Sequence, residues 1–88
     1  MESYHLSLEN SRGELFSFYG KVMESISFPK LPLGGERIFL KDSPELFEYF
    51  KMRASPWEEL QKRFSNRTYK IEEINFGDVT VIKAKEID

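Results

Sequence analysis

The apolar residues at the start of the chain alternate with polar ones. Tyr4, Leu6 and Leu8 share one phase of a period of two, which is typical of a strand with one buried face. Further on, Ser11 and Glu14 have the spacing of a capping box, in which both side chains satisfy amides at the start of a helix. We therefore expect a strand near residues 4–8 and a helix that runs to about residue 26.

The middle of the chain predicts a second strand followed by two helices. Residues 37–41 contain three consecutive apolar residues, which indicates a central strand covered in part on both sides. Asp42 or Ser43 then caps a helix that has Pro44 at its first position and ends within residues 52–54. A serine and a proline at residues 55–56 repeat this start signal, so a second, separate helix should begin there.

The last part of the chain returns to a period of two. Residues 69–71 and residues 74–76 have their apolar side chains in opposite phases, so the change at residues 72–73 indicates a β-bulge or a bend. The Gly-Asp pair at residues 77–78 favours a two-residue type II′ hairpin turn. The final strand covers residues 79–86, and its lysines suit an exposed sheet edge.

These elements predict a two-layer α+β fold for residues 1–88 as a single domain. Their order is β-α-β-α-α-β-β, with a small mixed sheet of four strands packed on helices. The apolar residues that the pattern directs inward form the expected core: Leu6, Leu8, Leu15, Phe18, Val22, Ile38, Leu40, Leu46, Phe50, Leu60, Ile71 and Val81.

Two stretches of the chain resemble each other. Residues 6–11 align with residues 38–43, and after a slip of one residue, residues 14–19 align with residues 45–50. Both copies combine an apolar strand, a polar turn with a serine, and a segment that begins Glu-Leu-Phe. The resemblance reflects either duplication or, as we favour, similar local physics, and both explanations predict a strand followed by a helix in each copy.

Residues 28–36 form an unusually apolar connection. Two prolines and a Gly-Gly pair exclude a helix there. Phe28, Leu31 and Leu33 either cover the end of the core or form an exposed contact patch, and we expect them to cover the core.

Composition limits the chemistry that is available. The chain has 88 residues, of which 40% are apolar and 32% charged, as is usual for a globular domain. It has no cysteine, so disulfides and thiolate chemistry are excluded, and a catalytic relay would need His5 beside a carboxylate. We recognise no catalytic motif, signal peptide or membrane-spanning stretch. We therefore expect a cytoplasmic protein that is not an enzyme and has no metal, cofactor or membrane partner.

Basic residues gather in one part of an otherwise acidic chain. Residues 51–70 hold six Lys or Arg and two Asp or Glu, a local charge of +4, whereas the whole chain has a net charge of −2. Trp57, Phe64 and Tyr69 are interleaved with these cations, a combination that can hold phosphates and stack bases. Against this use, a pI near 5.5 lacks the basic balance of most nucleic-acid-binding domains.

The predicted layers leave one sheet face uncovered. If the first crossover is right-handed, the helices lie on one side of the sheet. A partly apolar, uncovered sheet face is a natural docking surface. The residues that we expect on this open face are His5, Ser7, Phe39, Lys70, Asn75 and Thr80.

These observations favour a small non-enzymatic protein that blocks or neutralises a partner protein, a class that includes intracellular immunity proteins and phage-encoded inhibitors. The alternative is a nucleic-acid-binding module that uses residues 51–70. The contact surface is left open between residues 28–36, the open sheet face and the last helix, on which we expect a half-buried Trp57. The candidate partner-binding residues are Arg53, Trp57, Lys62, Arg63, Arg67 and Phe39.

Overall fold

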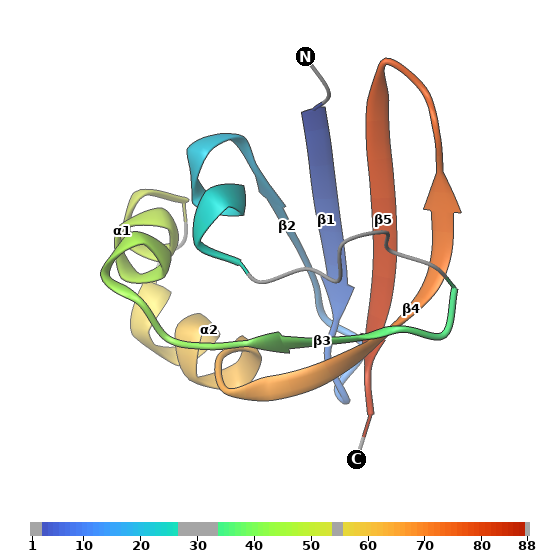
Figure 1. Cartoon of the computed structure of the whole chain (residues 1–88). Coiled ribbons are helices and arrows are strands. Elements are labelled where there is room, and N and C mark those ends of the chain that lie inside the picture. Colours follow the sequence, from blue (N-terminus) through green and yellow to red (C-terminus); the bar gives the residue numbers. More distant parts are fainter. Residues whose placement is uncertain (1–2, 27–33, 54–55, 88) are drawn as a thin grey trace.

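A computed structural model describes residues 3–26, 34–53 and 56–87, and its α+β architecture confirms the expected fold class (Figure 1). None of the helices within these ranges has the length and apolar composition needed to cross a membrane. The elements in chain order are β1 (Ser3–Glu9), β2 (Leu15–Tyr19), the 3-10 helix η1 (Gly20–Ser25), β3 (Arg37–Leu40), α1 (Pro44–Arg53), α2 (Trp57–Phe64), β4 (Arg67–Asn75) and β5 (Val79–Glu86).

The strands form one mixed sheet in the order β2-β1-β5-β4-β3. β1 and β5 are parallel, and the other neighbouring pairs are antiparallel. The sheet therefore has five strands among the described residues, where the sequence predicted four. It curls strongly, so that β3 runs across β1 and β5 in the view of Figure 1, with α1 and α2 beside the β2 edge.

The core lies between the concave face of the sheet and the helices. In the ladder, Leu6 of β1 stands between Phe18 of β2 and Ile82 of β5, and all three side chains are buried. Large aromatic rings fill the space beneath the helices, and the ring of Phe16 stacks on that of Phe50 at a centroid distance of 5.0 Å. The buried apolar residues contributed by η1, α1 and α2 are Val22, Leu46, Tyr49, Phe50 and Phe64.

The sequence predicted most of this core correctly. Nine of the twelve expected residues are buried, while Leu60 and Val81 are half-buried. Leu15 is wrong, because its side chain is 68% exposed. It belongs to a strand, not a helix, and its phase is opposite to that of buried Phe18.

The predicted first helix is wrong. Its first half is strand β2, which pairs with β1, and its second half is only the short η1. The proposed capping box at Ser11 does not form. Instead, the side-chain oxygen of Asn10 accepts hydrogen bonds from the amides of Arg12 and Glu14, which closes a tight β1–β2 turn.

The two similar stretches consequently fold differently. Residues 45–50 are helical because Ser43 caps them, accepting a 3.1 Å hydrogen bond from the Leu46 amide, and Pro44 occupies the first helical position. Residues 14–19 lack this start, and residues 15–19 of this stretch pair with β1. The resemblance therefore does not reflect a repeated β-α unit.

The positions of β3 and β5 in the sheet also correct the sequence interpretation. β3 was expected to be central but is an edge strand, and Phe39 on it is 50% exposed. β5 was expected at an edge but is central, between β1 and β4. Its lysines are tolerated there because they lie on the convex face and pair with acids of the neighbouring strands, Lys83 with Glu73 and Lys85 with Glu9.

The bulge predicted at residues 72–73 is confirmed. Ile71 pairs with Ala84 and Glu73 pairs with Lys83, so the ladder shifts by one residue between them. This shift lets apolar residues of opposite sequence phase face the same core. The predicted two-residue turn at residues 77–78 is wrong, because the last β4–β5 pair is Asn75 with Val81 and Gly77 lacks the positive φ of a type II′ turn.

The start of α2 differs slightly from the prediction. The helix begins at Trp57, and Pro56 stands before it in an extended conformation. The proposed cap Ser55 and the apolar residues of the connection, Phe28, Leu31 and Leu33, lie outside the described residues.

Candidate binding groove

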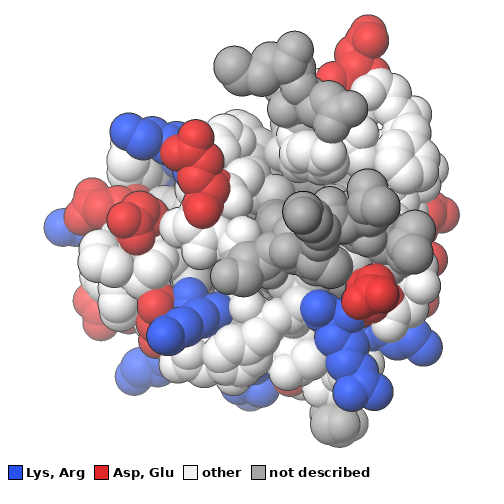
Figure 2. All heavy atoms as spheres, viewed as in Figure 1, with Lys and Arg blue, Asp and Glu red and all other residues white. Residues whose placement is uncertain are grey.

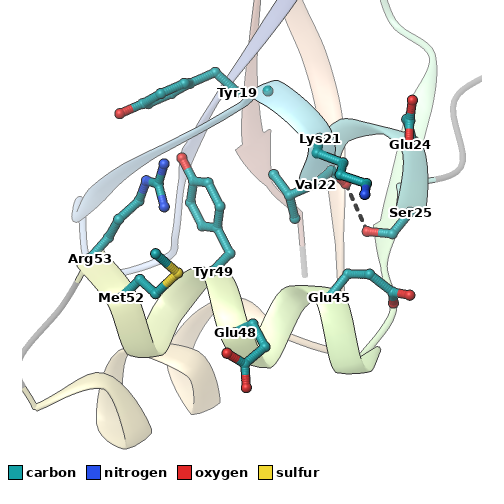
Figure 3. A pocket seen from close by; sticks show the side chains of 11 residues that line it. Tyr19, Lys21, Val22, Glu24, Ser25, Glu45, Glu48, Tyr49, Met52 and Arg53 are labelled. Atoms are coloured by element: carbon teal, nitrogen blue, oxygen red, sulfur yellow. Dashed lines mark hydrogen bonds between the residues drawn. The ribbon is translucent and has the colours of Figure 1, made fainter.

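An open groove of about 600 Å³ lies between η1 and α1 (Figure 3). Val22 and Tyr49 form its floor, and the exposed side chains of Tyr19 and Met52 form part of its rim. Tyr19 is 43% exposed and Met52 is 75% exposed, so apolar and aromatic surface is presented to solvent at this position. Such surface favours the binding of another molecule over simple solvation.

Gly20 creates one wall of the groove. Its φ of +80° lies in the left-handed region, where a glycine carries no steric penalty. This conformation turns the chain out of β2 directly into η1, so that η1 faces α1 instead of continuing the strand.

Tyr49 joins the opposite wall to the sheet. Its hydroxyl donates a 2.7 Å hydrogen bond to the backbone carbonyl of Ser17 on β2, the edge strand nearest α1. Burial raises the pKa of the Tyr49 phenol, while nearby Arg53 and the backbone amide of Tyr19 act in the opposite direction. The phenol therefore occupies part of the β2 edge where an added strand would otherwise pair.

Arg53, at the end of α1, lies against aromatic rings. Its guanidinium carbon is 4.1 Å from the centroid of the Tyr49 ring and 5.2 Å from that of the Tyr19 ring. These are cation–π distances, and stacking of this kind restricts the long side chain. The structure thus places one predicted partner-binding residue, Arg53, in the groove.

The charged residues of the groove are arranged along its length. Arg53 lies at the Tyr19 end, whereas Glu24 and Glu45 lie at the opposite end (Figure 3). Glu48 follows the α1 side, and Lys21 projects from η1 toward the end where Glu24 and Glu45 lie. The guanidinium of Arg53 and the carboxylates of Glu24 and Glu45 therefore lie at opposite ends of the groove.

The basic segment at residues 51–70 does not form one continuous patch. The Arg63 Nε lies 2.8 Å from a Glu14 carboxylate oxygen, and Arg67 donates a 3.0 Å hydrogen bond to Glu86. Lys62 is exposed on α2. On the face seen in Figure 2, basic and acidic side chains are interspersed.

The aromatic residues of the same segment are mostly unavailable for stacking on bases. Phe64 and Tyr69 are fully buried, and the Tyr69 hydroxyl donates to the Phe64 carbonyl. Burial raises the pKa of the Tyr69 phenol far above its ordinary range. Trp57 is half-buried, as expected, and its ring meets the Phe47 ring edge-on at 6.1 Å. Trp57 thus packs helix against helix.

Phe39 lies on the convex face of the sheet and does not line the groove. His5, Ser7, Phe39, Lys70 and Asn75 have the phase of this face, as predicted. Thr80 does not have this phase and is buried on the concave side. In the parallel β1–β5 register it pairs with Tyr4, which has the same phase as buried Leu6. A second hollow of about 430 Å³ on the convex face is bordered by the ion-paired lysines of β5.

His5, the residue on which an enzymatic role would depend, lies on the convex face with its ring 5.1 Å from that of Tyr19. Within the described ranges, no group of three or more His, Asp or Glu residues is arranged to hold a metal ion.

Sequence reasoning missed most of the groove. Tyr49, Met52 and the acids of α1 were interpreted only as helix positions, and Tyr19 was assigned to the wrong element. A usable signal did exist, because Tyr49 and Arg53 are four residues apart and so share a helix face. Their position opposite η1 could be recognised only once residues 15–19 were known to be a strand.

Comparison of the chain with profiles of known protein families, with curated proteins and with solved structures found no match.

Proposed function

We propose that this chain is a cytoplasmic, non-enzymatic binding domain that blocks or neutralises a partner protein, and that the groove between η1 and α1 receives the partner. The observation that carries the proposal is the conjunction of exposed Tyr19 and Met52 with a stacked Arg53 around one open groove. Tyrosine, methionine and arginine are enriched in protein interfaces. Restricted side chains also lose less entropy when a partner binds.

A nucleic-acid-binding role for residues 51–70 is less well supported. Only the local charge of +4 favours it. Arg63 and Arg67 already pair with carboxylates, and two of the three interleaved aromatic residues are buried. Phosphate contacts by these arginines would have to replace intramolecular ion pairs.

Affinity capture from a native lysate, carried out with the wild-type chain and with surface variants, tests the proposal. The immobilised wild-type chain is compared with Met52→Glu in the groove, Phe39→Glu on the convex sheet face and Lys62→Glu on α2, three exposed positions on different surfaces. We expect a protein to be retained in stoichiometric amount by the wild type, Phe39→Glu and Lys62→Glu, but not by Met52→Glu. Retention of RNA or DNA instead, lost in Lys62→Glu, would contradict the proposal and favour the nucleic-acid alternative.

A further inference from the structure

The arginine in the groove differs in its surroundings from the two on α2 and β4. Arg63 and Arg67 form ion pairs with carboxylates, whereas none of the ion pairs between described residues involves Arg53. Arg53 is nevertheless held in place by the rings of Tyr49 and Tyr19. A guanidinium that is held in place but has no carboxylate partner among the described residues is suited to receive a planar carboxylate in a bidentate arrangement.

The other end of the groove has the opposite character. Glu24 and Glu45 line it, Glu48 follows on the α1 side, and none of the three takes part in an ion pair between described residues. Lys21 lowers the negative charge here but does not cancel it, since one lysine accompanies three acids. A cationic group on a ligand would therefore be favoured here.

Apolar surface separates the two ends. Val22 lies at the floor and Met52 at the rim, and the methionine side chain adapts readily to different apolar partners. A ligand that spans the groove thus meets a guanidinium, then an apolar surface, then carboxylates.

We propose that the groove binds a segment of a partner protein with an acidic side chain at Arg53, an apolar side chain against Val22 and Met52, and a basic side chain at Glu45 and Glu48. This inference rests on the proposed protein-binding function and specifies its partner. Charge complementarity selects a polypeptide, because neighbouring residues of a protein can carry opposite charges. A nucleic-acid backbone is negative throughout and would be repelled by the acidic end.

Selection from a random peptide library displayed on phage tests this inference and does not require an identified partner. The wild-type chain serves as the target, and one enriched peptide is then synthesised and its affinity measured by fluorescence anisotropy. We expect enriched peptides to combine an acidic, an apolar and a basic residue. Arg53→Glu should weaken binding about thirtyfold, the smallest loss that defines a hot-spot residue.

Lys51→Glu is the matched control. It makes the same change of charge two residues away on α1 but does not line the groove, so we expect affinity within about twofold of the wild type. Glu45→Lys tests the acidic end with a residue that is exposed and supports no described contact in the core. A peptide with its acidic residue replaced by lysine should regain affinity for Arg53→Glu, which a merely misfolded variant would not allow.

The failures of the two proposals are distinguishable. If enriched peptides lose affinity with Met52→Glu but not with Arg53→Glu or Glu45→Lys, the charge pattern is wrong and the binding function stands. If a single-stranded oligonucleotide binds in the groove in place of peptides, or if no peptide is enriched, both the inference and the proposed function are overturned.

Discussion

The phenolic hydroxyl of Tyr49 on α1 donates a 2.7 Å hydrogen bond to the backbone carbonyl of Ser17 on β2. The contact ties the helical layer to an edge of the sheet and fixes the Tyr49 ring on which Arg53 lies. The same residue therefore supports the fold and shapes the groove.

Replacing Tyr49 with phenylalanine should lower the free energy of unfolding by about 0.5–1.5 kcal/mol, because the ring is kept while the Ser17 carbonyl loses its partner. Urea denaturation followed by circular dichroism measures this change. Tyr19→Phe is the control, because the Tyr19 side chain is substantially exposed and its hydroxyl donates no described hydrogen bond. Equal losses in both variants would show that the Tyr49 hydroxyl is not a stabilising contact.

Phe50→Ala should be among the most destabilising substitutions, with a loss of about 3–5 kcal/mol. Phe50 is fully buried, and its ring contacts those of Phe16 and Phe18. Phe47→Ala, three residues earlier on the same helix, should cost only about 1 kcal/mol, because that ring is partly exposed and meets mainly Trp57. A loss below about 1 kcal/mol for Phe50→Ala would mean that α1 is rotated.

Features that depend on local sequence patterns were predicted, whereas features that depend on long-range contacts were not. The strand phases, the Ser43 cap and the bulge at residues 72–73 were predictable, because each is a local pattern with one physical meaning. The strand at residues 15–19 could not be predicted, because its amino-acid sequence resembles that of residues 45–50, which are helical. There, pairing with β1 decided between strand and helix, and local sequence does not encode such long-range contacts.

The groove was not predicted, because it depends on the same strand at residues 15–19. With residues 15–26 interpreted as one helix, Tyr19 and Gly20 had no relation to α1, and the segment after α1 was predicted to supply most of the partner-binding residues. Arg53 alone was recognised, from its place in the charged segment. Its partners Tyr49 and Tyr19 come from elements that approach each other only in the folded chain.

Stability should fall in acid partly because of Glu14. The Asn10 side chain donates to its carboxylate, and with Arg63 it holds the pKa of Glu14 below the ordinary value of 4.5, against the opposing effect of partial burial. A carboxyl whose folded pKa is lowered stabilises the fold above its unfolded pKa, and this contribution is lost as the pH falls through the folded pKa.

NMR titration of the Glu14 carboxyl checks this prediction. We expect a pKa below 4.5 in the wild type and a value closer to 4.5 in Arg63→Gln. Glu14→Gln should also flatten the decline of unfolding free energy below pH 4.5. A wild-type pKa at or above 4.5 would show that these contacts do not persist in solution.

Trp57 fluorescence can separate the groove from α2 as the binding surface. Its ring is half-buried beside Phe47 and does not line the groove. Emission should therefore be partly shielded from quenchers and should stay unchanged when a groove-binding peptide is added. A blue shift on addition of the peptide would place the contact on α2.

Binding of a partner protein in the groove between η1 and α1 is tested most directly by titrating the isotope-labelled chain with the captured protein and following the backbone amide chemical shifts. We expect the perturbed amides to cluster at residues 19–25 and 45–53. Perturbations concentrated on residues 56–70, or on the convex face around Phe39, would contradict it.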